Sequence, residues 1–349
     1  MLRSREPRRG KAPPHRPIEQ RAGKPQMNKL FAIAGNTFVE TIRQPIYGIL
    51  MWVAFGLLVL NPSIAAYSLE SGSDTKIMID VGLSTMLLYG LLASVFCAVS
   101  VITREIESFT VLTVVSKPVS RPLFLAGKFL GVAAAMCVSF YFLSIIFLMT
   151  VRHGVMETNA DKYDLPVWTF TTAALVISLL AAAFGNFTYG WHFSATLTSW
   201  AVPLLTLALV GVLFFDKEFK PQPPTTDFSD MQVIYALIGV FLAVLILTAF
   251  AVTFATRFSQ AATLLLCAGV FWLGLLSDYY FGAHQDRSLL HNLAYHLLPN
   301  FQFFWFGDAI TQDRTIPARH VGYVAGYAGL YISGVLGLGV AMFQTREVG

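Results

Sequence analysis

The sequence predicts an all-α membrane protein that crosses the bilayer several times. Hydrophobic residues make up 55% of its 349 residues, charged residues only 13%, and the mean hydropathy is +0.61. A soluble domain carries about 25% charged residues. Long segments such as residues 81–102 contain no charged residue at all. Since about 20 apolar residues cross the hydrocarbon of a bilayer, such segments predict membrane-spanning helices.

The first 26 residues differ from the rest of the chain. They carry eight basic and two acidic residues and five prolines, a composition that predicts a disordered tail. One interpretation is a basic arm attracted to anionic lipid. The other, which we favour, is that translation starts at Met27. The part after the tail has 16 basic and 18 acidic residues, a net charge of −2, so the basic balance gives no support to nucleic-acid binding.

Residues 27–45 predict an amphipathic elbow helix at the membrane interface, with Phe31, Ala34, Phe38 and Ile42 at helical spacing and a break before Pro45. Apolar segments then predict about eight spans within a membrane domain of residues 46–349. The predicted spans are residues 46–67, 81–102, 123–151, 167–184, 194–215, 232–256, 261–276 and 321–343. A six-span layout, with two middle segments re-entrant or lying flat, is the alternative.

The connector between the second and third spans concentrates charge and turn signals. Residues 104–117 predict a short amphipathic helix, with polar residues between apolar ones that recur at every third position. The apolar positions are Ile106, Phe109, Leu112 and Val115. Pro118 ends this helix, because proline disfavours helix in the residue before it. Ser120 and Pro122 predict an N-cap and an early-turn proline that begin the next helix.

Three runs in this stretch, E-x-E-x-x-T, S-K-P-V-S-R and G-K-F-L-G, resemble the membrane subunit of ABC-2-type ATP-binding-cassette transporters. The resemblance extends more loosely from Met27 to the C-terminus. It implies that residues 104–117 form a coupling helix, which docks on a separate cytoplasmic ATPase subunit. The matching residues, implied to couple the permease to the ATPase, are Glu105, Glu107, Thr110, Ser116, Lys117, Pro118, Arg121 and Lys128.

The resemblance also implies the rest of the assembly. It predicts a permease in the cell (inner) membrane that acts as a homodimer or heterodimer and exports an unidentified substrate. Eight spans with a cytoplasmic connector put both termini in the cytoplasm, which the distribution of basic residues supports only weakly. Two alternatives are a secondary carrier without an ATPase and a structural anchor of a membrane complex. The carrier is disfavoured because the predicted spans have almost no ionisable residues.

Few residues suggest chemistry of their own, so we expect neither enzymatic activity nor a cofactor. Gly127-Lys128 is followed by Phe129 and lacks the other features of a nucleotide-binding loop, and no metalloprotease or esterase motif occurs. The three cysteines, Cys97, Cys137 and Cys267, all fall in predicted spans and are expected to behave as small apolar side chains.

Residues 278–320 predict a long external loop with two notable clusters. His284, His291 and His296 suggest a metal site, but their spacing is poor for zinc and no cysteine joins them, so no metal is expected. The aromatic run at residues 301–306 predicts a belt at the outer membrane interface. The alternative for this run is a hydrophobic gate or a substrate contact.

Overall fold

The computed structural model of the chain describes residues 26–66, 74–107, 120–156, 163–228, 231–282 and 289–344. Within this part, seven helices are long and apolar enough to cross a membrane. They are α2 (Pro45–Ala65), α3 (Asp74–Glu107), α5 (Arg121–His153), α6 (Leu165–Tyr189), α7 (Phe193–Val212), α8 (Gln232–Ala255) and α13 (Ala318–Gln344). The prediction of an all-α polytopic fold is therefore confirmed. The predicted span at residues 261–276 coincides with α9 (Gln260–Leu275), a shorter apolar helix of 16 residues.

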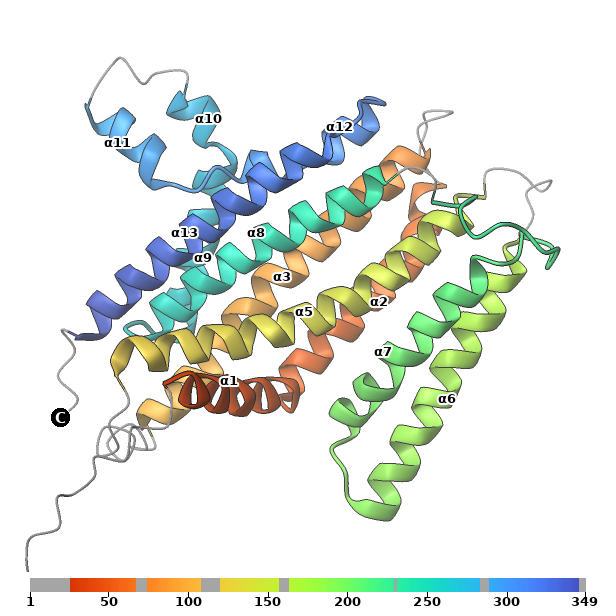
Figure 1. The fold of residues 1–349 in the computed structure, drawn as a ribbon, viewed down its shortest axis with the longest axis horizontal. Coiled ribbons are helices and arrows are strands. Elements are labelled where there is room, and N and C mark those ends of the chain that lie inside the picture. Colours follow the sequence, from red (N-terminus) through yellow and green to blue (C-terminus); the bar gives the residue numbers. More distant parts are fainter. Residues whose placement is uncertain are drawn as a thin grey trace, which may run out of the picture.

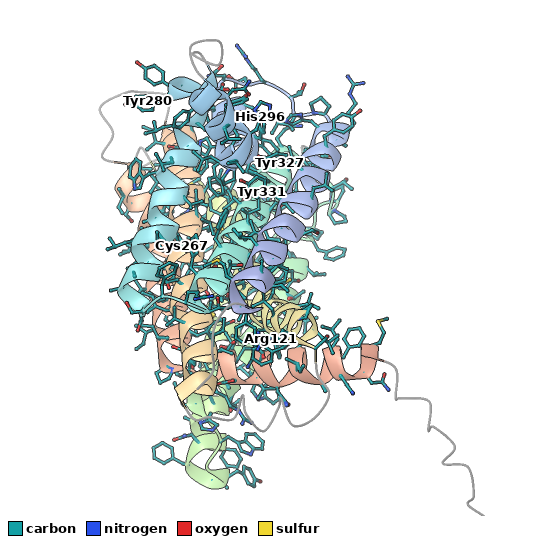
Figure 2. The ribbon with its side chains drawn as sticks, turned by 90° about the vertical axis from the view of Figure 1, so that its left-hand side faces the viewer. Arg121, Cys267, Tyr280, His296, Tyr327 and Tyr331 are labelled. Carbon is teal, nitrogen blue, oxygen red and sulfur yellow. The ribbon has the colours of Figure 1, made fainter. Side chains whose placement is uncertain are left out.

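From α2 to α8, consecutive long helices run in opposite directions along the bundle, and α13 runs in the same direction as α8 because the shorter α9 returns the chain between them (Figure 1). The helix α1 (Gln26–Ile42) lies across one end of this bundle, close to the first turns of α5 (Figures 1 and 2). We call this the α1 end; Figure 2 shows Arg121 there, with Tyr280 and His296 at the opposite end. The last turn of α13 also lies at the α1 end, where the Phe343 ring contacts that of Phe124 in the first turns of α5.

Three helices form the centre of the bundle. In the apolar 18-residue stretch of α3, 72% of the residues are buried inside the protein, and in those of α5 and α8 the share is 61% each. The corresponding shares for α2, α6, α7 and α13 are only 22–33%. The outer helices therefore turn most of their apolar surface away from the protein, as lipid-facing helices do. Polar contacts between helices supplement this packing: the hydroxyls of Ser94 and Thr248 lie 2.8 Å apart between α3 and α8, and Tyr47 Oη donates to the Ala135 carbonyl at 3.0 Å.

The turns between helices follow the sequence signals. Ser120 is the N-cap of α5 and Pro122 lies in its first turn, as predicted, although the Ser120 hydroxyl makes no capping hydrogen bond. The helix α6 ends at Gly190, whose φ of +67° is a left-handed conformation that glycine adopts without strain. The helix α6 therefore continues beyond the predicted span at residues 167–184.

The loop before α13 contains short helices. They are α10 (Ser277–Tyr280), α11 (Leu289–Leu297), η2 (Phe301–Phe304) and α12 (Gly307–Thr311). The aromatic-belt prediction is wrong for Phe301, Phe304 and Phe306, which are only 2%, 1% and 5% exposed. The reason is close packing against small residues: a Cβ added at Gly274 would lie 2.5 Å from Phe301 Cδ2. Sequence alone cannot show that η2 folds inward onto α8 and α9.

Candidate functional site

The predicted connector begins and ends at the α1 end of the bundle. Residues 104–107 continue α3 without a break, so the expected separate start of a coupling helix at Arg104 is absent. The next residue that the structure describes is Ser120, the N-cap of α5. The helix α1 contacts both α3 and α5. The two central helices that the connector joins are therefore held by the same transverse helix.

The contact between α1 and α5 depends on two glycines, which are those of the G-K-F-L-G run. A Cβ added at Gly127 would lie 2.7 Å from Ile33 Cγ2, and one at Gly131 would lie 2.6 Å from the Ala34 carbonyl oxygen. Glycines four residues apart lie on one face of a helix, where they let another backbone approach closely. The sequence pattern therefore has a local structural reason: it forms the surface on which α1 rests.

The first turns of α5 also bind the end of α13. The Arg121 guanidinium donates to the Phe343 carbonyl at 3.3 Å and lies 5.7 Å from the centroid of the Phe343 ring. The rings of Phe124 and Phe343 stack with their centroids 5.9 Å apart. From the turn after α8, Arg257 Nε donates to the Met342 carbonyl at 2.9 Å. Two cations thus bind the last carbonyls of α13, where the helix dipole favours positive charge.

The predicted coupling residues that the structure describes have different surroundings. Arg121 is half-buried against α13, whereas Lys128 is only 2% exposed and its Nζ lies 5.6 Å from the centroid of the Phe124 ring. That distance suits a cation–π contact. A partner subunit cannot reach Lys128 without displacing α1 or α5. Any role of Lys128 in coupling would therefore act through packing, which its position in the sequence motif did not reveal.

The other predicted coupling residues are described in part or not at all. Glu105 and Glu107 have helical backbone at the end of α3. Their side chains lie outside the described residues, as do Thr110, Ser116, Lys117 and Pro118. The predicted basic tail also lies outside them, except for Gln26 at the start of α1.

A buried ionic network, which the sequence analysis missed, lies at the opposite end of the bundle. Arg152 Nε is 3.0 Å from Asp227 Oδ2 and 3.4 Å from Asp164 Oδ2. The side chains of Arg152 and Asp164 are 4% and 0% exposed. Arg152 also donates to the carbonyls of Val212, at 2.7 Å, and Phe215. One guanidinium therefore links the end of α5 to the start of α6 and to the loop after α7.

One sequence signal pointed to part of this network. Asp164 precedes Leu165-Pro166, a pattern typical of an N-cap followed by an early proline. In the structure Asp164 Oδ1 accepts from the Val167 amide at 3.1 Å, so Asp164 is the N-cap of α6. The contribution of Asp227, 63 residues further along the chain, had no local signal. The sequence alone therefore could not bring these three charged residues together.

The histidine cluster gives no candidate metal site in the part of the chain that the structure covers. Among those residues, no group of three or more potential ligands could hold a metal ion. His296 is exposed on α11, and its Nδ1 lies 2.8 Å from the Asn292 carbonyl, a contact within the helix. His284 and the side chain of His291 lie outside the described residues.

Comparison with protein families adds one finding. Residues 20–189 match the model of a family described as ABC-2 family transporter protein. The match covers α1 to α6 and includes the connector, the two α5 glycines and Arg152, while α7 to α13 lie beyond it. None of the curated proteins matches the chain.

Proposed function

Because residues 20–189 of this multi-pass membrane protein belong to the ABC-2 transporter family, we propose that the chain is the permease half of an ATP-driven exporter. A separate cytoplasmic ATPase subunit binds and hydrolyses ATP, and the connector at residues 104–117 receives the resulting movement. Two permease chains, identical or different, form the membrane part of the complex. In this proposal the α1 end faces the cytoplasm and both termini lie there.

The observation that supports this function best is the mechanical continuity of the connector with the centre of the bundle. Residues 104–107 belong to the same helix as Ser94, whose hydroxyl contacts Thr248 of α8 in the buried centre. On its other side the connector leads into α5, which is packed against α1 and α13. A displacement of the connector therefore moves α3 and α5, two of the three central helices, rather than a peripheral loop.

Coupling of this kind requires two arrangements of the bundle with different contacts to the ATPase. ATP binding can shift the equilibrium toward one arrangement only by the difference in free energy between the contacts made in the two arrangements. The helix α1 is suited to move with α5 as one unit, because its close backbone contact with Gly127 and Gly131 leaves little room for sliding. On this basis α1 and the cytoplasmic half of α5 form the moving part of the permease.

The test reverses a charge on the connector in the purified permease–ATPase complex. Glu107→Arg, and separately Thr110→Pro, should leave membrane insertion intact and reduce permease-stimulated ATP hydrolysis about tenfold or more, the loss expected when an interfacial polar contact is broken. Stimulated and basal rates are measured in nanodiscs. Glu218→Arg serves as the control, since Glu218 lies on the exposed loop between α7 and α8 at the opposite end and should leave stimulation unchanged.

Two outcomes would contradict the proposal. Full stimulation by both connector variants would show that the connector does not transmit movement from the ATPase. Failure of any ATPase subunit to copurify with the wild-type chain from native membranes would favour the secondary carrier, and copurification with a protein other than an ATPase would favour the structural anchor.

A further inference from the structure

The helices α6 and α7 form a hairpin whose turn lies at the α1 end of the bundle (Figure 1). The two helices and the turn between them, residues 165–215, contain no aspartate, glutamate, lysine or arginine. The loops at the other end of the hairpin differ, because they contain charged residues such as Asp164, Asp216, Lys217 and Glu218. Turns that lie in water are usually polar. The α6–α7 turn therefore lacks the charged side chains that would favour a position in water.

The side chains around this turn are large, apolar and exposed. Phe187 is 90% exposed, and Phe184, Tyr189 and Trp191 are each more than half exposed. Leu180, Phe184 and Phe187 follow one another at spacings of four and three residues, so they lie along one exposed face of α6. The lipid-facing surface of the span is therefore continuous with the surface of the turn.

The backbone of the turn forms its hydrogen bonds within the turn itself. The Gly190 amide donates to the Asn186 carbonyl at 3.1 Å, and the Trp191 amide donates to the Gly185 carbonyl at 3.2 Å. The Asn186 side chain donates from Nδ2 to the Trp191 carbonyl at 2.7 Å. Backbone groups in a membrane must bond to the protein, because lipid offers them no partners. These groups of the turn can therefore enter the membrane without losing their hydrogen bonds.

The length of α6 limits how far the turn can reach. This helix begins directly after a charged segment, so its first turn lies near the boundary with water. Its 25 residues rise about 37 Å, more than the hydrocarbon of about 30 Å but less than the bilayer with its headgroups, about 40–45 Å. The last turn of α6 therefore ends in the opposite headgroup layer. Tyrosine and tryptophan favour this layer, because their rings are apolar and their O–H or N–H groups can bond to headgroups.

We propose that the α6–α7 turn is an anchor that binds phospholipid at the boundary between headgroups and acyl chains. The rings of Phe184 and Phe187 lie among the acyl chains, and those of Tyr189 and Trp191 lie at the headgroups. Because the turn has no charged side chain, the anchor needs no anionic lipid and accepts zwitterionic phospholipids. The inference rests on the membrane-spanning fold and does not depend on ATP coupling.

Electron paramagnetic resonance of a nitroxide at position 187 tests this proposal. The full chain carries Phe187→Cys together with Cys137→Ala, which removes the exposed native thiol among the three cysteines. In nanodiscs of phosphatidylcholine, collisions with a polar nickel chelate should be at least about tenfold less frequent at position 187 than at Thr225→Cys, because lipid excludes polar molecules. Collisions with oxygen should be more frequent at position 187. Thr225 is the matched control, since it is exposed on the loop at the other end of the hairpin.

The thickness of the bilayer separates lipid from protein as the cover of the turn. When dioleoyl lipid replaces the shorter dimyristoyl lipid, the hydrocarbon thickens, so nickel collisions at position 187 should fall further and those at Thr225→Cys should not change. Phe184→Cys gives a second position on the same face should Phe187→Cys not fold. Nickel collisions as frequent as at Thr225→Cys would place the turn in water and overturn the proposal. Few collisions with either reagent, independent of lipid length, would mean that protein covers the turn, which would overturn it as well.

Discussion

Replacing Arg152 with methionine is expected to lower the free energy of unfolding by about 3–5 kcal/mol, the effect of removing one partner from a buried ion pair. The substitution leaves the carboxylate of Asp164 buried without its cation and frees the carbonyls of Val212 and Phe215. Methionine keeps an unbranched apolar stem in place of the arginine stem, so the loss should come mainly from the missing guanidinium. The measurement is thermal and denaturant unfolding of the protein in nanodiscs.

Two variants distinguish this network from ordinary surface charge. Lys220→Ala breaks the Lys220–Glu218 pair, whose lysine is 70% exposed, and should leave the free energy of unfolding nearly unchanged. Arg152→Met combined with Asp164→Asn should recover part of the loss, because the second substitution removes the uncompensated charge and asparagine still caps α6. A stability of Arg152→Met equal to that of the wild type would mean that water reaches these carboxylates.

The second large effect is expected from Gly131→Leu, which should displace α1 from α5. A Cβ at this position would already lie 2.4 Å from the Thr37 Cβ and 2.6 Å from the Ala34 carbonyl oxygen, so a larger side chain must push the α1 backbone away. Overpacking of this kind costs about 1–3 kcal/mol. If α1 and α5 move together during transport, the stimulation of the ATPase should fall more than stability does. Both quantities are measured on the same purified complex.

The matched control is Gly35→Ala on α1 itself. A Cβ at Gly35 would have no atom within 4 Å, and alanine favours helix over glycine by about 1 kcal/mol. Gly35→Ala should therefore stabilise α1 slightly and leave coupling unchanged. If Gly131→Leu behaved in the same way, the close contact between α1 and α5 would have no functional importance.

The positions of the long helices could be predicted from the sequence because a bilayer imposes a simple requirement: a long run of apolar residues without charge. The segments at residues 81–102 and 232–256 satisfy it and coincide with α3 and α8. The same requirement says nothing about which side of a helix faces protein. The inward packing of Phe301 and the burial of Lys128 followed from contacts with distant segments, and neither residue has a local signal for burial.

The candidate site could be predicted only where it is local in sequence. The connector was found because charge, turn residues and a family-like motif occur together in residues 104–131. The position of the α6–α7 turn beside α1 had no local signal, because His192 is far along the chain from Arg43 and only the fold brings the two together. The ionic network was missed for the same reason, since Asp227 reaches Arg152 from the loop after α7.

The short helix α9 has a consequence for the lipid around this protein. Its 16 residues rise about 24 Å, whereas the hydrocarbon of a typical bilayer is about 30 Å thick. Its outward side chains, among them Leu265 and Trp272, are exposed and apolar, so they contact acyl chains. Hydrophobic mismatch then compresses the membrane on the α9 side and not on the side of the longer α6. The protein would sit in a bilayer of uneven thickness, and its working cycle should be sensitive to the chain length of the surrounding lipids.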